Sequence, residues 1–286
     1  RMSERGGSEE NERSAVRDAS KHPAPASTSK VARPRETCEP RKGWGSLRPP
    51  TGKAPGKRQR AFDAPPPAFT HLVVLDFEWT ADNRRAMLPV PEITQFPSVL
   101  VRLDGTRSCA VDEFDTYVRP TFNPVLTPFS IELTNIQQAD VDNAQALPEV
   151  LRRYMAWLES HSLVDGATGE RKGNWAFCTW SDADLGGQLV RELKAKLIPL
   201  PPCFDRWVNL KELYKRHFKM EPSGGLEACV ERIGLRFSGR AHNGLVDSRN
   251  TAAIVLRMSQ GSYMHGAFVF RRTTRGLDKD GNPFGS

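Results

Sequence analysis

The feature that most constrains this 286-residue chain is a change of sequence texture near residue 70. From His71 onward, short apolar segments typical of strands alternate with longer segments whose apolar residues recur at helical spacing. Three predicted strands come first, and further strands then alternate with helices. This order predicts an α/β fold in which a mixed β-sheet is flanked by helices.

The expected elements follow from the apolar spacing and from the turn residues between them. Short connections between the first three strands suggest a meander. The predicted strands cover 71–77, 96–103, 113–120, 175–180 and 206–210, and the predicted helices cover 147–160, 185–197, 226–235 and 246–258.

The first 70 residues have a different composition. They carry 15 Lys and Arg against 8 Asp and Glu, and 10 of the 22 prolines. Because such a segment buries too little apolar surface to offset its ordering entropy, we predict a disordered, basic, Pro-rich tail over 1–68. Subtracting these residues from totals of 41 basic and 34 acidic leaves 26 of each, so the net charge of +7 lies in the tail. A basic tail suits either a solvated linker, which we favour, or an arm with non-specific affinity for nucleic acid.

The remaining sequence predicts one folded domain over 69–262 and a C-terminal extension over 263–286. No long uncharged apolar run suggests a membrane span or a signal peptide. We expect no membrane partner and an intracellular location; we favour the cytoplasm or nucleus, and the mitochondrion is the remaining alternative. None of the five cysteines forms a CxxC pair, which argues against a zinc module.

Two carboxylates, Asp76 and Glu78, end the apolar run of the first predicted strand. Side chains two residues apart on a strand share a face, so this pair should project together. Two ionised carboxylates in a dry site require a positive partner, and a hard divalent ion suits oxygen ligands. Taken alone, so short a motif fits equally well with one acid facing solvent at the end of a strand.

Three further residues have the chemistry that a metal-dependent site would need. Asp184 follows the strand 175–180 at the start of a helix, where an acid alone would be interpreted as a helix cap. His242 lies in a Gly-flanked loop without the apolar periodicity of a core histidine. Asp247 follows five residues later, at the opening of the last predicted helix.

The sequence resembles the DEDDh family of 3′–5′ exonucleases, specifically its Eri1-like exoribonuclease branch. The matching blocks run from about Leu72 to Met258 in the family's order: "DFEWT", "EITQFPSVLV", "FDTYVRP", "ELTNIQQADVD", "TWSDADLG" and "FSGRAHNGLVDSRNTA". The resemblance implies a ribonuclease-H-like mixed sheet, which agrees with the elements predicted above.

The resemblance also assigns the site. The first family motif falls on Asp76 and Glu78, the second on Asp184, and the third on His242 and Asp247. It implies two Mg²⁺ ions, for which Mn²⁺ can substitute, with Asp76 bridging both. Glu78 and Asp247 would hold mainly the ion on the nucleophile side, and Asp184 would assist through water. His242 would remove a proton from the attacking water, because an imidazole titrates near neutral pH.

The second motif is ambiguous by two residues. Relatives carry a Trp-Asp pair that maps to Ala183 and Asp184, and Asp182 is the alternative. Ala183 therefore replaces an aromatic residue that can cover one face of the terminal base. Asn135 replaces the Gly of the family's "LTGI" segment, and Val246 stands where relatives often have an Asp; neither change removes a metal ligand.

The residues expected to handle substrate fall in two segments. Main-chain groups and a hydroxyl after the first motif would meet the terminal nucleotide, and a second segment would lie near its base, where an aromatic ring can stack. For Trp79 and Phe129, ordinary packing is an equally favoured interpretation. The seven residues are Phe77, Trp79, Thr80, Phe129, Leu133, Thr134 and Ile136.

The implied function is a divalent-metal-dependent 3′–5′ exoribonuclease that releases 5′-mononucleotides from RNA with a free 3′ end; the sequence identifies no protein partner. Two alternatives remain. A DNA exonuclease of the same family would share the ligands, since sugar discrimination depends on few contacts. A non-catalytic RNA-binding adaptor could retain the fold, but it would not need four acids that repel one another without metal.

Overall fold

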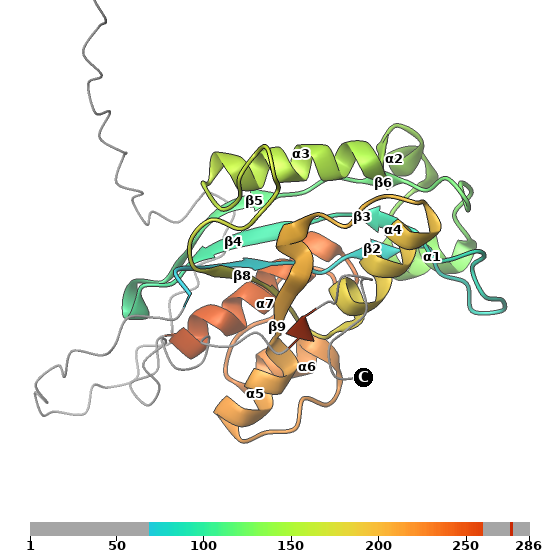
Figure 1. Ribbon diagram of the computed structural model, residues 1–286. Helices are drawn as coiled ribbons and strands as arrows, with labels where there is room; N and C mark the ends of the chain where they lie inside the picture. The colour runs from blue at the N-terminus through green and yellow to red at the C-terminus, as the bar shows by residue number, and fades with distance from the viewer. Residues whose placement is uncertain (1–68, 260–274, 277–286) are drawn as a thin grey trace, which may run out of the picture. The chain divides into compact units, whose positions relative to one another are not determined.

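A computed structural model describes residues 69–259 and 275–276 of the chain (Figure 1). The predicted tail 1–68 and all but two residues of the predicted extension 263–286 lie outside the described residues. Within the described part, no helix combines the length and the apolar character needed to cross a membrane.

The strands are short, and most of them follow the apolar runs of the sequence. They are β1 (His71–Val74), β2 (Glu78–Trp79), β3 (Ile93–Gln95), β4 (Ser98–Arg102), β5 (Cys109–Phe114), β6 (Val118–Arg119), β7 (Gln145–Ala146), β8 (Trp175–Thr179), β9 (Arg206–Asn209) and β10 (Arg275–Gly276).

Helical segments connect these strands and flank the sheet. The α-helices are α1 (Pro128–Thr134), α2 (Gln138–Asp142), α3 (Leu147–Ser160), α4 (Val190–Ala195), α5 (Leu210–Phe218), α6 (Gly225–Arg232) and α7 (Gly244–Ser259). Three other helical turns are the 3₁₀ turns η1 (Gly105–Arg107) and η3 (Pro202–Asp205) and the π-helical turn η2 (Ala183–Leu189).

The main sheet has six strands in the order β10-β9-β8-β1-β4-β5. β1 pairs in parallel with β8, and β8 with β9, whereas β4 is antiparallel to both β1 and β5. The predicted mixed sheet is confirmed. β1, β4 and β5 are antiparallel neighbours, but the third strand predicted for the meander overlaps β5 only at residues 113–114. Two-stranded pairs β2-β3 and β6-β7 lie beside it.

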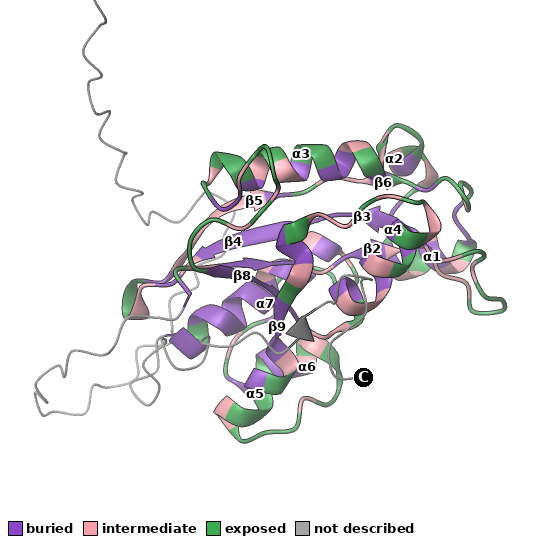
Figure 2. Ribbon diagram, in the orientation of Figure 1, coloured by how far each residue is buried: buried purple, intermediate pink, exposed green. Residues whose placement is uncertain are grey.

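Both faces of the sheet are covered, because alternate residues of its central strands enter different core clusters. Leu72 and Val74 of β1 join α5, α6 and α7 in one cluster, while Val73 packs with α3 and α4 in the other. β8 alternates in the same way, with Phe177 on the α3 side and Cys178 on the α7 side. Figure 2 shows α7 as almost wholly buried, whereas α3 exposes its outer face.

The structure differs from the predicted elements in several places. The first strand ends at Val74 rather than at residue 77, so the first acid lies beyond it. The expected strand 113–120 divides between β5 and β6, which belong to different sheets. The sequence did not predict α1, α2 or α5. Residues 275–276, which belong to the expected C-terminal extension, form β10 and pair with β9 in the main sheet.

A buried ion triad fastens the β2-β3 pair to α4. Glu92 and Glu192 are both inaccessible to solvent. Lys196 places its Nζ 2.7 Å from an oxygen of Glu92 and 2.8 Å from an oxygen of Glu192. Three main-chain amides from residues 121–123 also donate to Glu92, and the amide of Ile93 in β3 donates to Glu192. Because residues next to β3 and in α4 share one ammonium group, the triad fixes the strand pair to which Glu78 belongs.

The pKa values of the two acids of the triad shift in opposite directions. Burial raises the pKa of both, but for Glu92 the bonds from Lys196 and the three amides outweigh burial and leave its pKa below the usual value. For Glu192, burial prevails and its pKa is raised. The greater number of amide donors at Glu92 explains the difference.

We expect Lys196→Met to lower the free energy of unfolding by about 3–5 kcal/mol at neutral pH, because it leaves two buried carboxylates without their cation. Urea denaturation measures this loss. Lys194→Met, at an exposed position in α4, is the matched control and should change stability by less than about 0.5 kcal/mol. Equal stability of the two variants would show that the triad does not hold the fold together.

Candidate active site

The first predicted acids lie on either side of a break between two strands. Asp76 follows the end of β1, and Glu78 begins β2, where it pairs with Gln95 of β3. The pair is therefore not carried by one continuous strand, as the sequence suggested. The two acids are nevertheless brought together, since the charge of Glu78 contributes to the raised pKa of Asp76.

Asp184 approaches this pair from the π-helical turn η2. Its Oδ1 accepts a hydrogen bond of 2.8 Å from the main-chain amide of Phe77, which lies between the two acids of the first motif. π-helical turns are found frequently at functional sites. The bond connects residues 107 positions apart and directs Asp184 toward Asp76.

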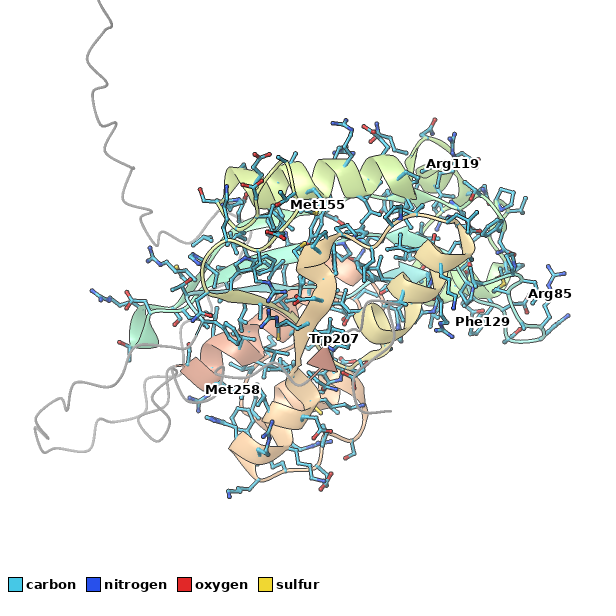
Figure 3. The ribbon with its side chains drawn as sticks, in the orientation of Figure 1. Arg85, Arg119, Phe129, Met155, Trp207 and Met258 are labelled. Carbon is cyan, nitrogen blue, oxygen red and sulfur yellow. The ribbon has the colours of Figure 1, made fainter. Side chains whose placement is uncertain are left out.

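Asp182, the alternative second-motif acid, has a different partner. Its Oδ1 accepts a hydrogen bond of 2.9 Å from the indole nitrogen of Trp207, labelled in Figure 3. Gly186 allows this ring to pack against η2, because a Cβ there would lie 2.9 Å from the ring. Asp182 thus secures β9 to η2, while Asp184 turns toward the first motif.

The third motif is a tight loop at the start of α7. His242 adopts a left-handed backbone with φ of 61°, and its amide donates to Oδ2 of Asp247 over 2.8 Å. The side chain of Asn243 accepts from the amide of Val246, which caps the helix. As a result Asp247 is buried at 8% exposure, while the imidazole of His242 stays exposed.

Gly244 lets α7 approach the first motif closely. A Cβ at this position would lie 2.6 Å from the carbonyl oxygen of Asp76 and 2.9 Å from Pro97. The Gly244 amide donates to the side chain of Gln95 over 2.9 Å, and Gln95 in turn donates to Asp115. Gln95 and Gly244 were not predicted from the sequence, although both lie in blocks that carry the family resemblance.

Burial raises the pKa of all four acids, and for Asp76 and Glu78 the charges of neighbouring acids raise it further. For Asp76, burial and then the charges of Asp184, Asp247 and Glu78 hold the pKa well above its usual range. Burial and the charges of Asp247 and Asp184 raise the pKa of Glu78 to about 8. Burial is also the main cause that raises the pKa of Asp184 to about 7 and that of Asp247 to about 6. The site is therefore electrostatically strained wherever these groups are ionised together.

A divalent cation fits this donor set. All four groups supply oxygen ligands, and a cation would relieve the repulsion that raises their pKa values. As the side chains stand, no group of three or more His, Cys, Asp or Glu in the described residues has the arrangement of a finished metal site. The acids nevertheless share one electrostatic field, because the charges of Asp184, Asp247 and Glu78 all act on Asp76.

Comparisons with known proteins identify the family of the chain. The sequence model of the exonuclease family, RNase T, matches residues 73–255. ERI1 exoribonuclease 2 of Mus musculus is 33% identical over 243 residues, which cover 82% of this chain and 33% of the mouse protein. The 3′-5′ exonuclease Snipper of Drosophila melanogaster is 32% identical over 198 residues, covering 66% of this chain and 69% of the fly protein.

Among solved structures, the nuclease domain of 3′hExo, a DEDDh family member bound to rAMP, matches with a TM-score of 0.63. Its sequence identity is 29%, and the match covers 73% of this chain and 98% of that domain. The chain belongs to the Eri1-like branch of the DEDDh exonuclease family. The chain spans about one third of the length of the mouse ERI1 exoribonuclease 2. Membership of the DEDDh family implies dependence on a divalent metal, in agreement with the four acids.

Within this DEDDh exonuclease, the predicted substrate residues after the first motif are largely engaged by the protein. Phe77 packs its ring against Phe96 in the core and gives its amide to Asp184. Thr80 is 1% exposed, and its hydroxyl accepts from the amide of Glu92. Trp79 is half-buried against the α3-side core. A role for these three residues in binding substrate stays a prediction.

Helix α1 is anchored beside the first motif by its N-terminal residues. Thr127 caps α1 by accepting from the amide of Ser130, and its hydroxyl donates to the carbonyl of Ala81. The hydroxyl of Ser130 accepts from the Ala81 amide over 2.8 Å. The chain segment that follows Glu78 is therefore bound directly to the first turn of α1.

The predicted base-binding residues of this segment differ in exposure. Phe129 and Leu133 are half-buried on α1, and Figure 3 shows Phe129 at the same end of the molecule as Arg85. Thr134 and Ile136 are buried, and Ile136 packs in a small separate core. Phe129 and Leu133 therefore have exposed surface that a base can contact, whereas Thr134 and Ile136 are buried and stabilise the end of α1.

The raised pKa values predict how the metal-free domain responds to pH. In the unfolded chain these carboxyl groups titrate near pH 4, so between about pH 4 and pH 8 the folded state binds more protons than the unfolded state. Their contribution to stability is therefore present at low pH and is lost as the pH rises through the folded values.

We expect the melting temperature in EDTA to fall as the pH rises from 5 to 8, by roughly 2–4 °C for each kcal/mol of stability lost. Asp76→Asn removes one repelling charge, so this variant should melt higher than the wild type at pH 8 and respond less to pH. Thermal unfolding followed by circular dichroism decides the matter. Parallel pH profiles for the two proteins would contradict a coupled acid cluster.

Proposed function

We propose that this protein is a divalent-metal-dependent 3′–5′ exoribonuclease that releases 5′-mononucleotides from RNA 3′ ends. One observation supports the proposal above all others: four acids from three distant segments share one electrostatic site, next to an exposed histidine. The relatives are named as exoribonucleases or as a 3′-5′ exonuclease, which favours RNA as the substrate.

In this proposal Asp76, Glu78, Asp184 and Asp247 hold two Mg²⁺ ions, for which Mn²⁺ can substitute. When bound, such a pair supplies Lewis acidity to the attacking water and to the leaving oxygen. The chain itself fixes the positions of the acids through main-chain amides, as at Phe77 and His242. Hydrolysis then yields one 5′-mononucleotide and a new 3′-hydroxyl end.

His242 is the proposed general base. The residue is exposed to solvent and its main-chain amide is bound to Asp247, so the loop holds His242 beside one of the four acids. A base must lie within reach of the water whose proton it takes. The left-handed backbone at His242 sets the direction in which the ring leaves the loop.

The proposed test is incubation of the purified protein with 3′-labelled single-stranded RNA and DNA of the same sequence. We expect mononucleotide release from RNA in Mg²⁺ or Mn²⁺, and its loss in EDTA and in Asp76→Ala. Faster release from DNA would identify a DNA exonuclease instead. RNA binding without cleavage under any of these conditions would indicate an adaptor.

A matched pair of variants tests the second motif. Asp184→Asn should lower kcat by about 100-fold or more, because it removes a charge that the proposed ions need. Asp182→Asn keeps an oxygen that can accept from Trp207, so its activity should stay within about threefold of the wild type. Single-turnover cleavage of RNA measures both variants, and the reverse order of activities would move the second motif to Asp182.

A further inference from the structure

Arg240 lies in the loop between α6 and α7, two residues before the proposed base. It is exposed, and the glycine before it has a φ of 98°. A Cβ at Gly239 would lie 2.8 Å from a methyl group of Val246. The loop is therefore packed tightly against the first turn of α7, which fixes the position of the main chain at Arg240.

The side chain of Arg240 reaches across to α1. Its Nη2 donates a hydrogen bond of 2.6 Å to the main-chain carbonyl of Glu132, 108 residues away in sequence. This carbonyl belongs to the last turn of α1, where carbonyl groups lack partners within the helix. Arg240 thus connects the loop that carries His242 to the helix that carries Phe129.

The charge of Arg240 also reaches the acid cluster. It lowers the pKa of Glu78, against the larger effects of burial and the neighbouring acids. Arg249, which lies on α7, has its guanidinium paired with both oxygens of Glu113. Arg240 has no such acidic partner within 69–259, so its charge is not neutralised by an ion pair.

A guanidinium group carries five N–H donors, and the bond to Glu132 uses one of them. The remaining donors suit the planar, two-point recognition of a phosphate. The neighbouring acids create the need for such a contact, because four carboxylates repel the phosphates of an approaching RNA strand.

We propose that Arg240 binds a backbone phosphate of the RNA immediately upstream of the scissile bond, and that it holds the strand between α1 and the His242 loop. This assignment rests on the proposed exoribonuclease function. It gives the site a cation of its own that offsets the repulsion between the acids and the substrate.

Steady-state cleavage of single-stranded RNA by Arg240→Gln and Arg240→Lys tests the assignment. We expect kcat/KM to fall about tenfold or more in the Gln variant, since a charged hydrogen-bond donor is lost. The dependence of log kcat/KM on log salt concentration should become shallower by about 0.7, the value for one phosphate contact on a single strand. The Lys variant should keep the salt slope but not the full kcat/KM.

Arg236→Gln is the matched control, because Arg236 is an exposed arginine of the same loop. It should leave both kcat/KM and the salt slope unchanged. If Arg240 only anchors α1, its Gln variant will melt at a lower temperature while the salt slope stays at the wild-type value. That result would overturn the assignment.

Uncharged methylphosphonate linkages locate the phosphate. One such linkage at a time is placed upstream of the scissile bond. At the phosphate that Arg240 contacts, the uncharged linkage should lower wild-type kcat/KM by the same factor as Arg240→Gln does. The same linkage should not lower the kcat/KM of Arg240→Gln any further. Independent losses at every linkage would overturn the proposal.

The controls separate this proposal from the function on which it rests. Wild-type cleavage, and its loss in Asp76→Asn, tests the exonuclease function alone. If the wild type releases no nucleotide, that function fails. The RNA affinities of the wild type and Arg240→Gln over the same salt range then decide whether Arg240 contacts phosphate.

Discussion

The mutual repulsion of four partly desolvated carboxylates is the constraint on which the rest of this structure depends. Asp76, Glu78, Asp184 and Asp247 are held within one another's fields at a cost in stability, since burial and like charge both disfavour their ionised forms. The fold maintains this arrangement with main-chain donors and close helix packing. Clustered perturbed acids of this kind are typical of functional sites rather than of structural cores.

The positions of the acids follow from where the elements end. Parallel pairing of β1 with β8 brings the end of β1 and η2 to the same edge of the sheet, and the close approach at Gly244 adds the start of α7. The Glu92–Lys196–Glu192 triad fastens the β2-β3 pair, to which Glu78 belongs, to α4. The contacts that fix these elements lie outside the acid cluster. The position of each acid is therefore largely determined before any cation or substrate binds.

The sequence predicted the parts of the fold that have a strong apolar period. Helix 147–160 and the strands that begin at Trp175 and Arg206 coincide with α3, β8 and β9. It failed where elements are short: α1 and α2 have five to seven residues, too few to show a helical period. α5 carried a usable signal, since Asn209 caps it and Leu210, Leu213 and Tyr214 recur at helical spacing. Predicting one strand across Asp76 failed because an apolar run does not reveal where pairing stops.

The candidate acids were singled out by their chemistry and their places along the chain, and the resemblance assigned their roles, which stay predictions; the groups that position them could not be found in the same way. Gln95 and Gly244 act through a hydrogen bond and a missing Cβ, neither of which has a sequence signature. The most direct test of the central claim is a Mn²⁺ titration in which free ion is followed by electron paramagnetic resonance. We predict two bound ions per wild-type chain, fewer in Asp76→Asn and Asp247→Asn, and two in His242→Ala. Equal binding by the wild type and both Asn variants would contradict the account.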